Sequence, residues 1–388
     1  MTRVLGPSAV WLRGGLPLFL VAPIAYPFYS GPDLALLPKL AGLVGCSMIL
    51  TCASVGHISL HAFGRTTPMC LSAPLSPSHA RAASRVLSSF AFGSAALCIG
   101  AFASASASFV SGGSWSAGER APLYLGMTFA IYSAGSRVAA SPRVPPVVKL
   151  FFPPTICTAA GLILLTFAGD EPLGVQAELY TQGAGAALMA PVSPAMVTFG
   201  LFTHTYHELL RTRLLPLLAV AAVTVPGCLL ATAAVGRYVL HLPPSEIASM
   251  LPATTTTGLA LTMDTALPNA KREWIAMGPV LCGVSGMLIW PLLLRATGLA
   301  CAPAAVRGLA LGSTFHVSAM AALTLEGDSV AADFAAMGFF VMGVVRTVLL
   351  QSVTFQNFVA AIYGATRDDA CCGASGTSDE PPVAPSQQ

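Results

Sequence analysis

The sequence is short of charge. Only 9% of its 388 residues are Asp, Glu, Lys or Arg, whereas 55% are hydrophobic. A soluble domain of this size carries about 25% charged residues, so this composition is unsuited to water. The formal net charge of +3 is too small for a surface that binds nucleic acid, because such surfaces concentrate basic residues. The composition therefore excludes a soluble protein and a nucleic-acid partner, and it indicates that a lipid bilayer surrounds the chain.

Signatures of catalysis and of metal binding are also missing. The sequence contains no HExxH, GxSxG or P-loop motif, and no GxGxxG motif with a flanking strand pattern. Its ten cysteines form no CxxC pair and no zinc spacing, and most of them lie in apolar runs as small buried hydrophobes do. We therefore expect no catalytic residue, no metal site and no cofactor, and we expect a protein that is not an enzyme.

Long apolar runs are abundant. A helix that crosses the bilayer core needs about 20 apolar residues. Runs of roughly this length cover residues 16–29, 35–56, 86–111, 121–137, 150–168, 183–203, 214–235, 247–266, 274–294, 308–323 and 334–360. The pattern predicts an all-α, polytopic membrane protein with about 10–12 transmembrane segments. The last run is long enough to contain a break.

Changes in composition divide the chain into segments. Residues 1–66 predict an N-terminal membrane hairpin, and residues 67–85, which are rich in Pro, Ser and Arg, predict a linker. Residues 86–363 hold most of the apolar runs and predict the main membrane domain. Residues 364–388 are polar and contain several prolines, which favours a disordered tail. Basic loops alternate with an acidic loop at 169–182, so the basic face is expected in the cytoplasm, or in the stroma or matrix of an organelle.

Two apolar runs contain the same pattern, P-A-x-x-T-x-G-L. It occurs at residues 194–201 and again at residues 252–259. Proline inside a helix removes a hydrogen bond and clashes with the preceding turn, but it is well accepted at the first position of a new helix. Ser193 directly precedes the first proline and is a preferred N-cap, and Ser249 is a weaker candidate before the second. We therefore predict that each run is a broken helix that restarts at its proline.

Broken helices at corresponding positions of two halves indicate a transporter binding site. A half-helix N-terminus offers free N–H groups and about half a positive charge, so two of them meeting at mid-membrane would hold a small anion. Such kinks also occur in ordinary packing of membrane helices, so a purely structural role stays open. The predicted substrate-binding residues are Ser193, Pro194, Ala195, Thr198, Pro252, Ala253, Thr254, Thr255, Thr256, Thr257 and His316.

Several ionisable residues lie within apolar sequence. His316 and Asp264 are candidates for proton coupling, because a titratable group at membrane depth is costly and is usually functional. The structural alternatives are a neutral histidine bonded to the carbonyl of a neighbouring helix and an aspartate at a helix end near the interface. Arg346 is expected to pair with Asp264 or Glu326, or to extend its side chain toward the interface.

Three stretches of the sequence match a known pattern in order and spacing. Residues 193–197 (SPAMV) are similar to G-P-A-T-V, residues 249–260 (SMLPATTTTGLA) to S-L-L-P-K-S-V-T-T-P-I-A, and residues 307–316 (RGLALGSTFH) to R-G-L-A-L-G-T-A-S-H. From about residue 120 to 350 the chain thus resembles the LrgB family, which includes the plastidial glycolate/glycerate translocators. Residues 12–66 resemble, more weakly, the end of an LrgA-type partner.

The resemblance implies a carrier for a small organic anion, a monocarboxylate such as glycolate, glycerate or pyruvate. Length and charge pattern fit an organelle inner membrane of the plastid type and a plasma membrane equally well. Bacterial relatives are also described as holin-like proteins that affect murein hydrolase export, so a pore or regulator, or a homologue that does not transport, is the alternative. Ala253 replaces the family's lysine, Gly258 its proline and Phe315 its serine, which implies a changed substrate or impaired transport. Whether the protein acts as a homo-oligomer stays open.

Overall fold

The described part of the chain is helical throughout. The computed structural model describes residues 36–63, 117–141, 144, 157–158, 160–162, 173–190, 207–267 and 269–364. Its helices are α3 (Leu37–Phe63), α5 (Ala117–Ala140), α8 (Leu173–Tyr180), η2 (Thr181–Gly185), α9 (Ala186–Met189), α11 (His207–Ala234), η4 (Val235–Val239), α12 (Pro244–Met250), α13 (Thr257–Thr262), η5 (Asp264–Ala266), α14 (Arg272–Ala296), α15 (Ala304–Leu325), α16 (Ser329–Gln351) and α17 (Val353–Tyr363). No β-strand occurs in these residues.

Several helices have the length and composition of membrane spans. Within the described residues, four segments are long and apolar enough to cross a bilayer: Leu37–Phe63, Arg211–Val239, Arg272–Ala296 and Val330–Gln351. The prediction of an all-α polytopic membrane protein is therefore confirmed. The predicted total of about 10–12 spans includes runs that lie outside the described residues. The last apolar run is interrupted at Ser352, whose backbone is extended (φ −75°, ψ 116°) between α16 and α17.

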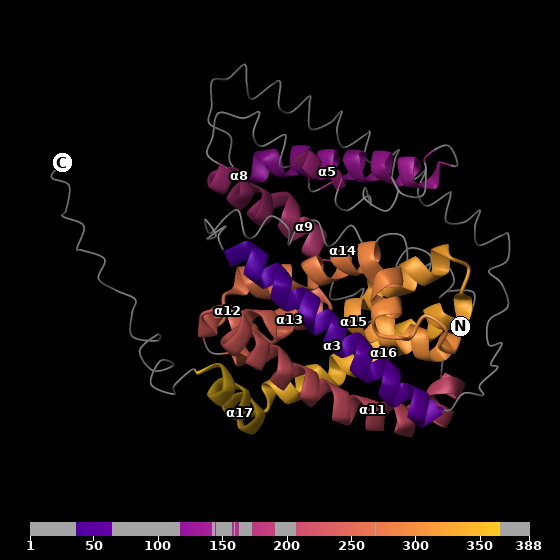
Figure 1. Ribbon diagram of the computed structural model, residues 1–388. Helices are drawn as coiled ribbons and strands as arrows, with labels where there is room; N and C mark the ends of the chain where they lie inside the picture. Colours follow the sequence, from indigo (N-terminus) through magenta and orange to yellow (C-terminus); the bar gives the residue numbers. More distant parts are fainter. Residues whose placement is uncertain are drawn as a thin grey trace, which may run out of the picture.

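Most of the helices form one bundle around a shared apolar core. α3, α11, α14, α15 and α16 pack on one another in it (Figure 1). Each contributes fully buried side chains, for example Leu43, Leu229, Val280, Leu309 and Phe334. The outer surface carries large apolar side chains, including exposed leucines and valines. Such a surface is unfavourable in water and natural in lipid, which agrees with the four candidate spans.

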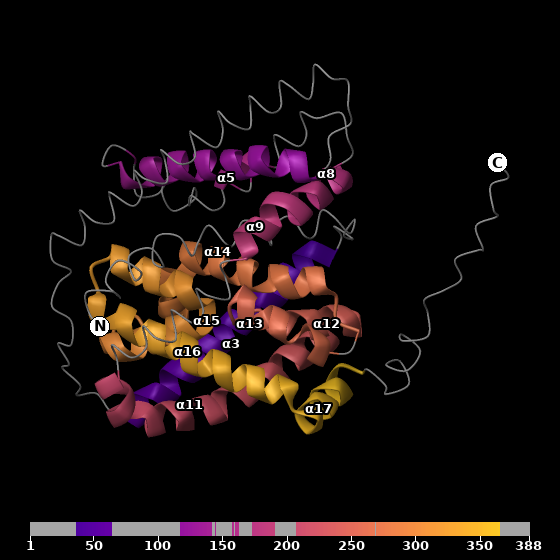
Figure 2. The same cartoon turned by 180° about the vertical axis from the view of Figure 1, so that it is seen from behind.

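A second, smaller apolar cluster joins α5 to the chain from α8 to α9. These helices lie together on one side of the bundle (Figure 1, Figure 2). Tyr124 and Tyr180 meet edge to face with ring centroids 5.9 Å apart, and the hydroxyls of Thr128 and Tyr180 lie 3.4 Å apart. Leu162, Ala184 and Leu188 are the other buried residues of the cluster. Aromatic packing of this kind fixes the angle between the two helical segments.

Helix α3 packs into the main bundle. Thr232 Oγ1 of α11 donates a hydrogen bond to Ser47 Oγ at 3.2 Å, and His57 Nε2 donates to the backbone oxygen of Thr297 at 3.0 Å. A Cβ added at Gly56 would overlap Leu299. Although the sequence placed α3 in an N-terminal hairpin, its side chains therefore form part of the same core as α11, α14 and α15.

Helices α15 and α16 form the closest pair in the bundle. Gly308 and Gly312 of α15 lie one turn apart and face Ala331 and Ala335 of α16, and a Cβ added at either glycine would overlap the facing alanine backbone. Small residues spaced by four allow helix backbones to approach closely in membranes. At the end of this hairpin Arg307 pairs with Asp328, with 2.6 Å between Nη2 and Oδ2. The pair is therefore held by backbone proximity along its length and by an ion pair at its end.

Candidate functional site

The run at residues 247–266 is a broken helix, as predicted. α12 ends at Met250, and the chain then forms turns until α13 begins at Thr257. Thr256 is extended (φ −76°, ψ 151°). The interruption places a polar, threonine-rich stretch inside the bundle, where all of residues 250–257 are buried.

The position of the restart differs from the prediction. The new helix starts at Thr257 and not at Pro252. The carbonyl of Pro252 accepts hydrogen bonds from the backbone N (2.9 Å) and from Oγ1 (2.6 Å) of Thr255, so the chain closes a turn there and cannot continue as a helix. Ser249 is not an N-cap, because its Oγ donates to the Ser245 carbonyl at 2.6 Å and accepts from Lys271 N at 2.7 Å.

The first copy of the repeat, at residues 194–201, is not part of the described structure. Ser193, Pro194, Ala195 and Thr198 lie outside the described residues. Their predicted part in the site, and the meeting of two proline-initiated half-helices, therefore stay predictions.

A second break in the described part of the chain occurs in α15. Phe315 (φ −125°, ψ 30°) and His316 (φ 50°, ψ −128°) are not helical, although helix precedes and follows them. A positive φ is strained for a residue with a side chain. The His316 side chain is buried, and its Nε2 donates to the carbonyl of Pro279 in α14 at 2.9 Å. This contact has the geometry of the structural alternative considered for His316, a bond to the carbonyl of a neighbouring helix.

Both breaks pack against glycines of α14. A Cβ added at Gly278 would lie 3.1 Å from Ala253 Cβ, and one added at Gly283 would lie 3.0 Å from His316 Cε1. The two glycines are five residues apart, which is about 8 Å along a helix axis. Glycines on two sides of α14 thus let two irregular backbone segments approach this helix closely, and irregular backbone inside a bundle is typical of membrane-protein binding sites.

Three hydroxyls at the first break have no partner. The Oγ1 atoms of Thr254, Thr256 and Thr257 are buried and form no hydrogen bond. Buried polar groups in native proteins are almost always satisfied by protein, water or ligand. Three unsatisfied donors on one short stretch therefore indicate a place where a polar guest or ordered water belongs.

Asp264 lies at a helix end. It begins η5, and its Oδ2 is 3.8 Å from Nε of Arg272. About a quarter of its side chain is exposed. This position corresponds to the structural alternative for Asp264 rather than to a deeply buried carboxylate.

The expected pairing of Arg346 is wrong. Its side chain is 3% exposed, so it does not extend to the interface. Of the two expected partners, Asp264 pairs with Arg272 instead, and Glu326 is exposed at the end of the α15–α16 hairpin. The rotation of α16 within the bundle turns Arg346 inward, and no sequence pattern indicated that direction.

An ion pair holds α12 to the start of α14 beside the first break. Lys271 Nζ lies 2.6 Å from Glu246 Oε1, and Ser245 Oγ donates to Glu246 Oε2 at 2.6 Å. Burial raises the pKa of Glu246, but the hydrogen bonds from Lys271 and Ser245 outweigh this effect, and the pKa lies below its ordinary value. Glu246 is therefore ionised at neutral pH and fixes one end of the broken segment.

The sequence analysis missed the contribution of α14. Gly278, Gly283 and Gly286 lie on one apolar run and make room for Ala253, His316 and Phe315. The spacing of these glycines could have indicated close contacts of α14 with other segments, but glycine is common in membrane helices for reasons of packing alone. The contacts could only be assigned once the helices were placed.

The fold and the two breaks define a class: a polytopic helical membrane protein with interrupted helices inside its bundle. Residues 128–355, more than half of the chain, match the model of the LrgB-like family. The chain belongs to the LrgB-like family, and the resemblance noted from its motifs is confirmed. It is thus a membrane protein of the LrgAB/holin-like type. No curated protein and no solved structure matches it.

Proposed function

We propose that the protein is a carrier for small monocarboxylates such as glycolate, glycerate or pyruvate. The observation that carries this proposal is the set of unpartnered hydroxyls of Thr254, Thr256 and Thr257 on a broken helix inside the bundle. A carboxylate accepts several hydrogen bonds, and a bond to a charged group contributes about 1.5–3 kcal/mol. Three hydroxyls can therefore bind a small acid in the absence of the lysine that Ala253 replaces.

The second break supports the proposal as a further irregular segment inside the bundle, on another side of α14. His316 lies against α14 about 8 Å along the helix axis from the contact of Ala253. Backbone groups at a break are free to bond a guest, because they lack partners within a helix. Phe315, which is fully buried, adds an apolar surface there. The combination of hydroxyls, irregular backbone and an apolar wall suits an acid of two or three carbons.

The direct test is uptake by purified full-length protein in proteoliposomes. We expect saturable uptake of at least one two- or three-carbon hydroxy or keto acid, and competition by its close analogues. A holin-like pore would give flux that does not saturate and little discrimination by size. A homologue without transport would give neither signal. Either of these two results would exclude the carrier.

A proton-coupled carrier would need a titrating group, for which we propose His316. Its buried imidazole donates through Nε2 to Pro279 O, and glutamine can keep this bond but cannot take up a proton. His316→Gln is therefore expected to flatten the dependence of uptake on pH. Asp264→Asn is the matched variant at the helix end, and we expect it to keep the wild-type pH profile. If His316→Gln keeps that profile and Asp264→Asn loses it, the role belongs to Asp264.

A further inference from the structure

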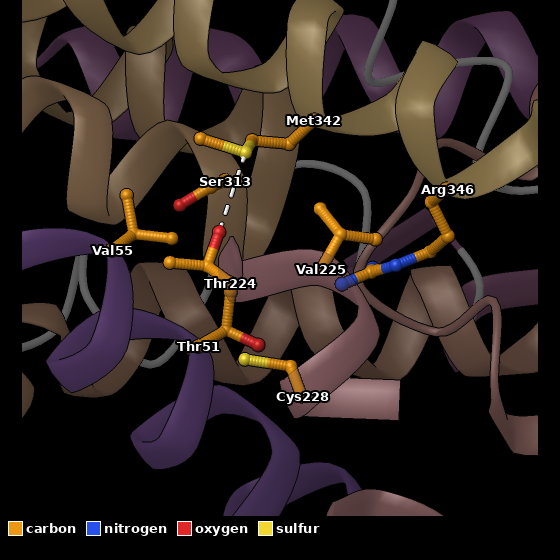
Figure 3. A pocket seen from close by; sticks show the side chains of 8 residues that line it. All are labelled: Thr51, Val55, Thr224, Val225, Cys228, Ser313, Met342 and Arg346. Carbon is orange, nitrogen blue, oxygen red and sulfur yellow. Dashed lines mark hydrogen bonds between the residues drawn. The ribbon is translucent and has the colours of Figure 1, made fainter. Parts of the chain in front are cut away.

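A second polar region lies between α3, α11, α15 and α16. A narrow crevice lies there, with about 160 Å³ of empty space that includes open solvent and with no room for a water molecule inside it. Figure 3 shows the side chains around it. It is lined by Thr51 and Val55 of α3, Thr224, Val225 and Cys228 of α11, Ser313 of α15, and Met342 and Arg346 of α16. Its lining does not include the threonines of the first break. Its residue from α15, Ser313, comes before the second break in the sequence.

Arg346 brings a buried positive charge to this crevice. Its side chain extends from α16 toward Val225 (Figure 3). It is 3% exposed, its Nε has no hydrogen-bond partner, and none of the ion pairs in the described part of the chain includes it. A guanidinium remains protonated in proteins. A buried charge without a partner is strongly unfavourable, so a compensating negative group is expected beside it.

The crevice offers hydrogen-bond donors and no carboxylate. The Oγ1 of Thr51 is buried and has no partner. The hydroxyl of Thr224 donates to the Val220 carbonyl at 2.7 Å, and that of Ser313 donates to the Leu309 carbonyl at 2.8 Å. Thr51 is thus the hydroxyl in the lining that is available to donate to a guest. The negative group must come from outside the lining.

We propose that this crevice binds one small monovalent anion, a short carboxylate or a halide, with Arg346 as its counter-charge and Thr51 as a hydrogen-bond donor. A single cation balances a single negative charge. Val55, Val225 and Met342 restrict the size of the guest. Because the crevice is narrow, binding requires a lining side chain to move, and the flexible Met342 is suited to this.

The site depends on a helix outside the family-matched region. Thr51 and Val55 belong to α3, whereas the match to the LrgB-like family begins at residue 128. The N-terminal segment would therefore contribute a ligand-binding residue and not only packing. Binding at this site does not require transport, so the proposal stands independently of the proposed carrier function.

The test is the anion dependence of thermal stability of the full-length protein in detergent. Chloride, acetate and glycolate are compared with the large anion gluconate at constant ionic strength. We expect a small anion to raise the melting temperature by about 5 °C with saturation. Arg346→Gln should abolish this rise, and Thr51→Val should weaken the apparent affinity about tenfold. Arg295→Gln removes an exposed arginine of α14 and should keep the wild-type response.

The results distinguish a carboxylate site from a halide site, and they test the proposal itself. A response to acetate and glycolate alone identifies a carboxylate site, and a response to chloride alone identifies a halide site. The proposal is overturned if no small anion stabilises the protein, or if Arg346→Gln responds as the wild type does. If Arg346→Gln does not fold, Arg346→Lys and Thr51→Val are measured in its place. An unchanged anion affinity in Thr51→Val would also overturn the proposal.

Discussion

Thr256→Val is expected to lower the apparent affinity for a transported monocarboxylate at least tenfold and to leave the fold intact. The Oγ1 of Thr256 is buried and unpartnered, so its removal breaks no hydrogen bond of the protein, and valine keeps the shape. A lost bond to a carboxylate costs about 1.5–3 kcal/mol, where 1.4 kcal/mol corresponds to about tenfold. Uptake in proteoliposomes and melting temperature in detergent measure the two effects separately. Thr257→Val should behave in the same way.

Two threonines of the same region serve as controls for this prediction. Thr262 in α13 is exposed, and its Oγ1 donates to Leu259 O at 2.7 Å, so Thr262→Val should leave the affinity unchanged. Thr255 Oγ1 bonds the Pro252 carbonyl, so Thr255→Val should lower the melting temperature by opening the turn. Wild-type affinity of Thr256→Val and Thr257→Val for every acid that is transported would remove these hydroxyls from the site.

Gly312→Ala is expected to lower the free energy of unfolding by about 2 kcal/mol. A Cβ at this position would overlap the carbonyl oxygen and the Cα of Ala335. The neighbour is backbone, so it cannot move aside as a side chain would, and α15 and α16 must separate. Gly308→Ala should act similarly against Ala331. Because α15 carries the second break, we also expect reduced uptake. Denaturant or thermal unfolding in detergent measures the loss.

Gly227→Ala is the matched control for the helix pair. No atom lies within 4 Å of a Cβ added at Gly227 in α11. Alanine has a higher helix propensity than glycine, so this variant should gain about 0.5–1 kcal/mol. A Gly312→Ala protein that gained stability as Gly227→Ala does would show that α15 and α16 are not in backbone contact.

Much of the architecture could be predicted from local properties of the chain. The repeat around Pro252 indicated an interrupted helix, because proline inside a helix removes a hydrogen bond. Proline alone did not decide the break, since Pro216, Pro226 and Pro279 lie inside continuous helices. The start of α13 at Thr257 could not be predicted from the proline. It depends on whether the Pro252 carbonyl accepts a hydrogen bond from the Thr255 side chain or from the next turn of a helix. The second break had no proline to mark it, and its nonhelical residues, Phe315 and His316, carry no local signal for an interruption.

The long-range contacts of polar residues were the hardest to predict. Arg346 could be recognised as costly within an apolar run, but its neighbours Thr51 and Cys228 come from helices far away in sequence. Likewise, the expected pairing of Arg346 with Asp264 depended on the distance between their side chains, which only the packed positions of α13, α14 and α16 define. Sequence spacing specifies neighbours on one helix, whereas contacts between helices depend on their rotation and approach.

By itself the sequence determined that the chain lies in a membrane and is helical, because hydropathy acts on a segment regardless of its neighbours, and its repeat indicated the break near Pro252. The tertiary structure alone decided that α14 contacts both breaks through Gly278 and Gly283, that the hydroxyls of Thr254, Thr256 and Thr257 remain unpartnered, and that Arg346 turns into the bundle toward α11. These features follow from how closely helix backbones approach and which face each turns inward, and both are properties of the packed bundle.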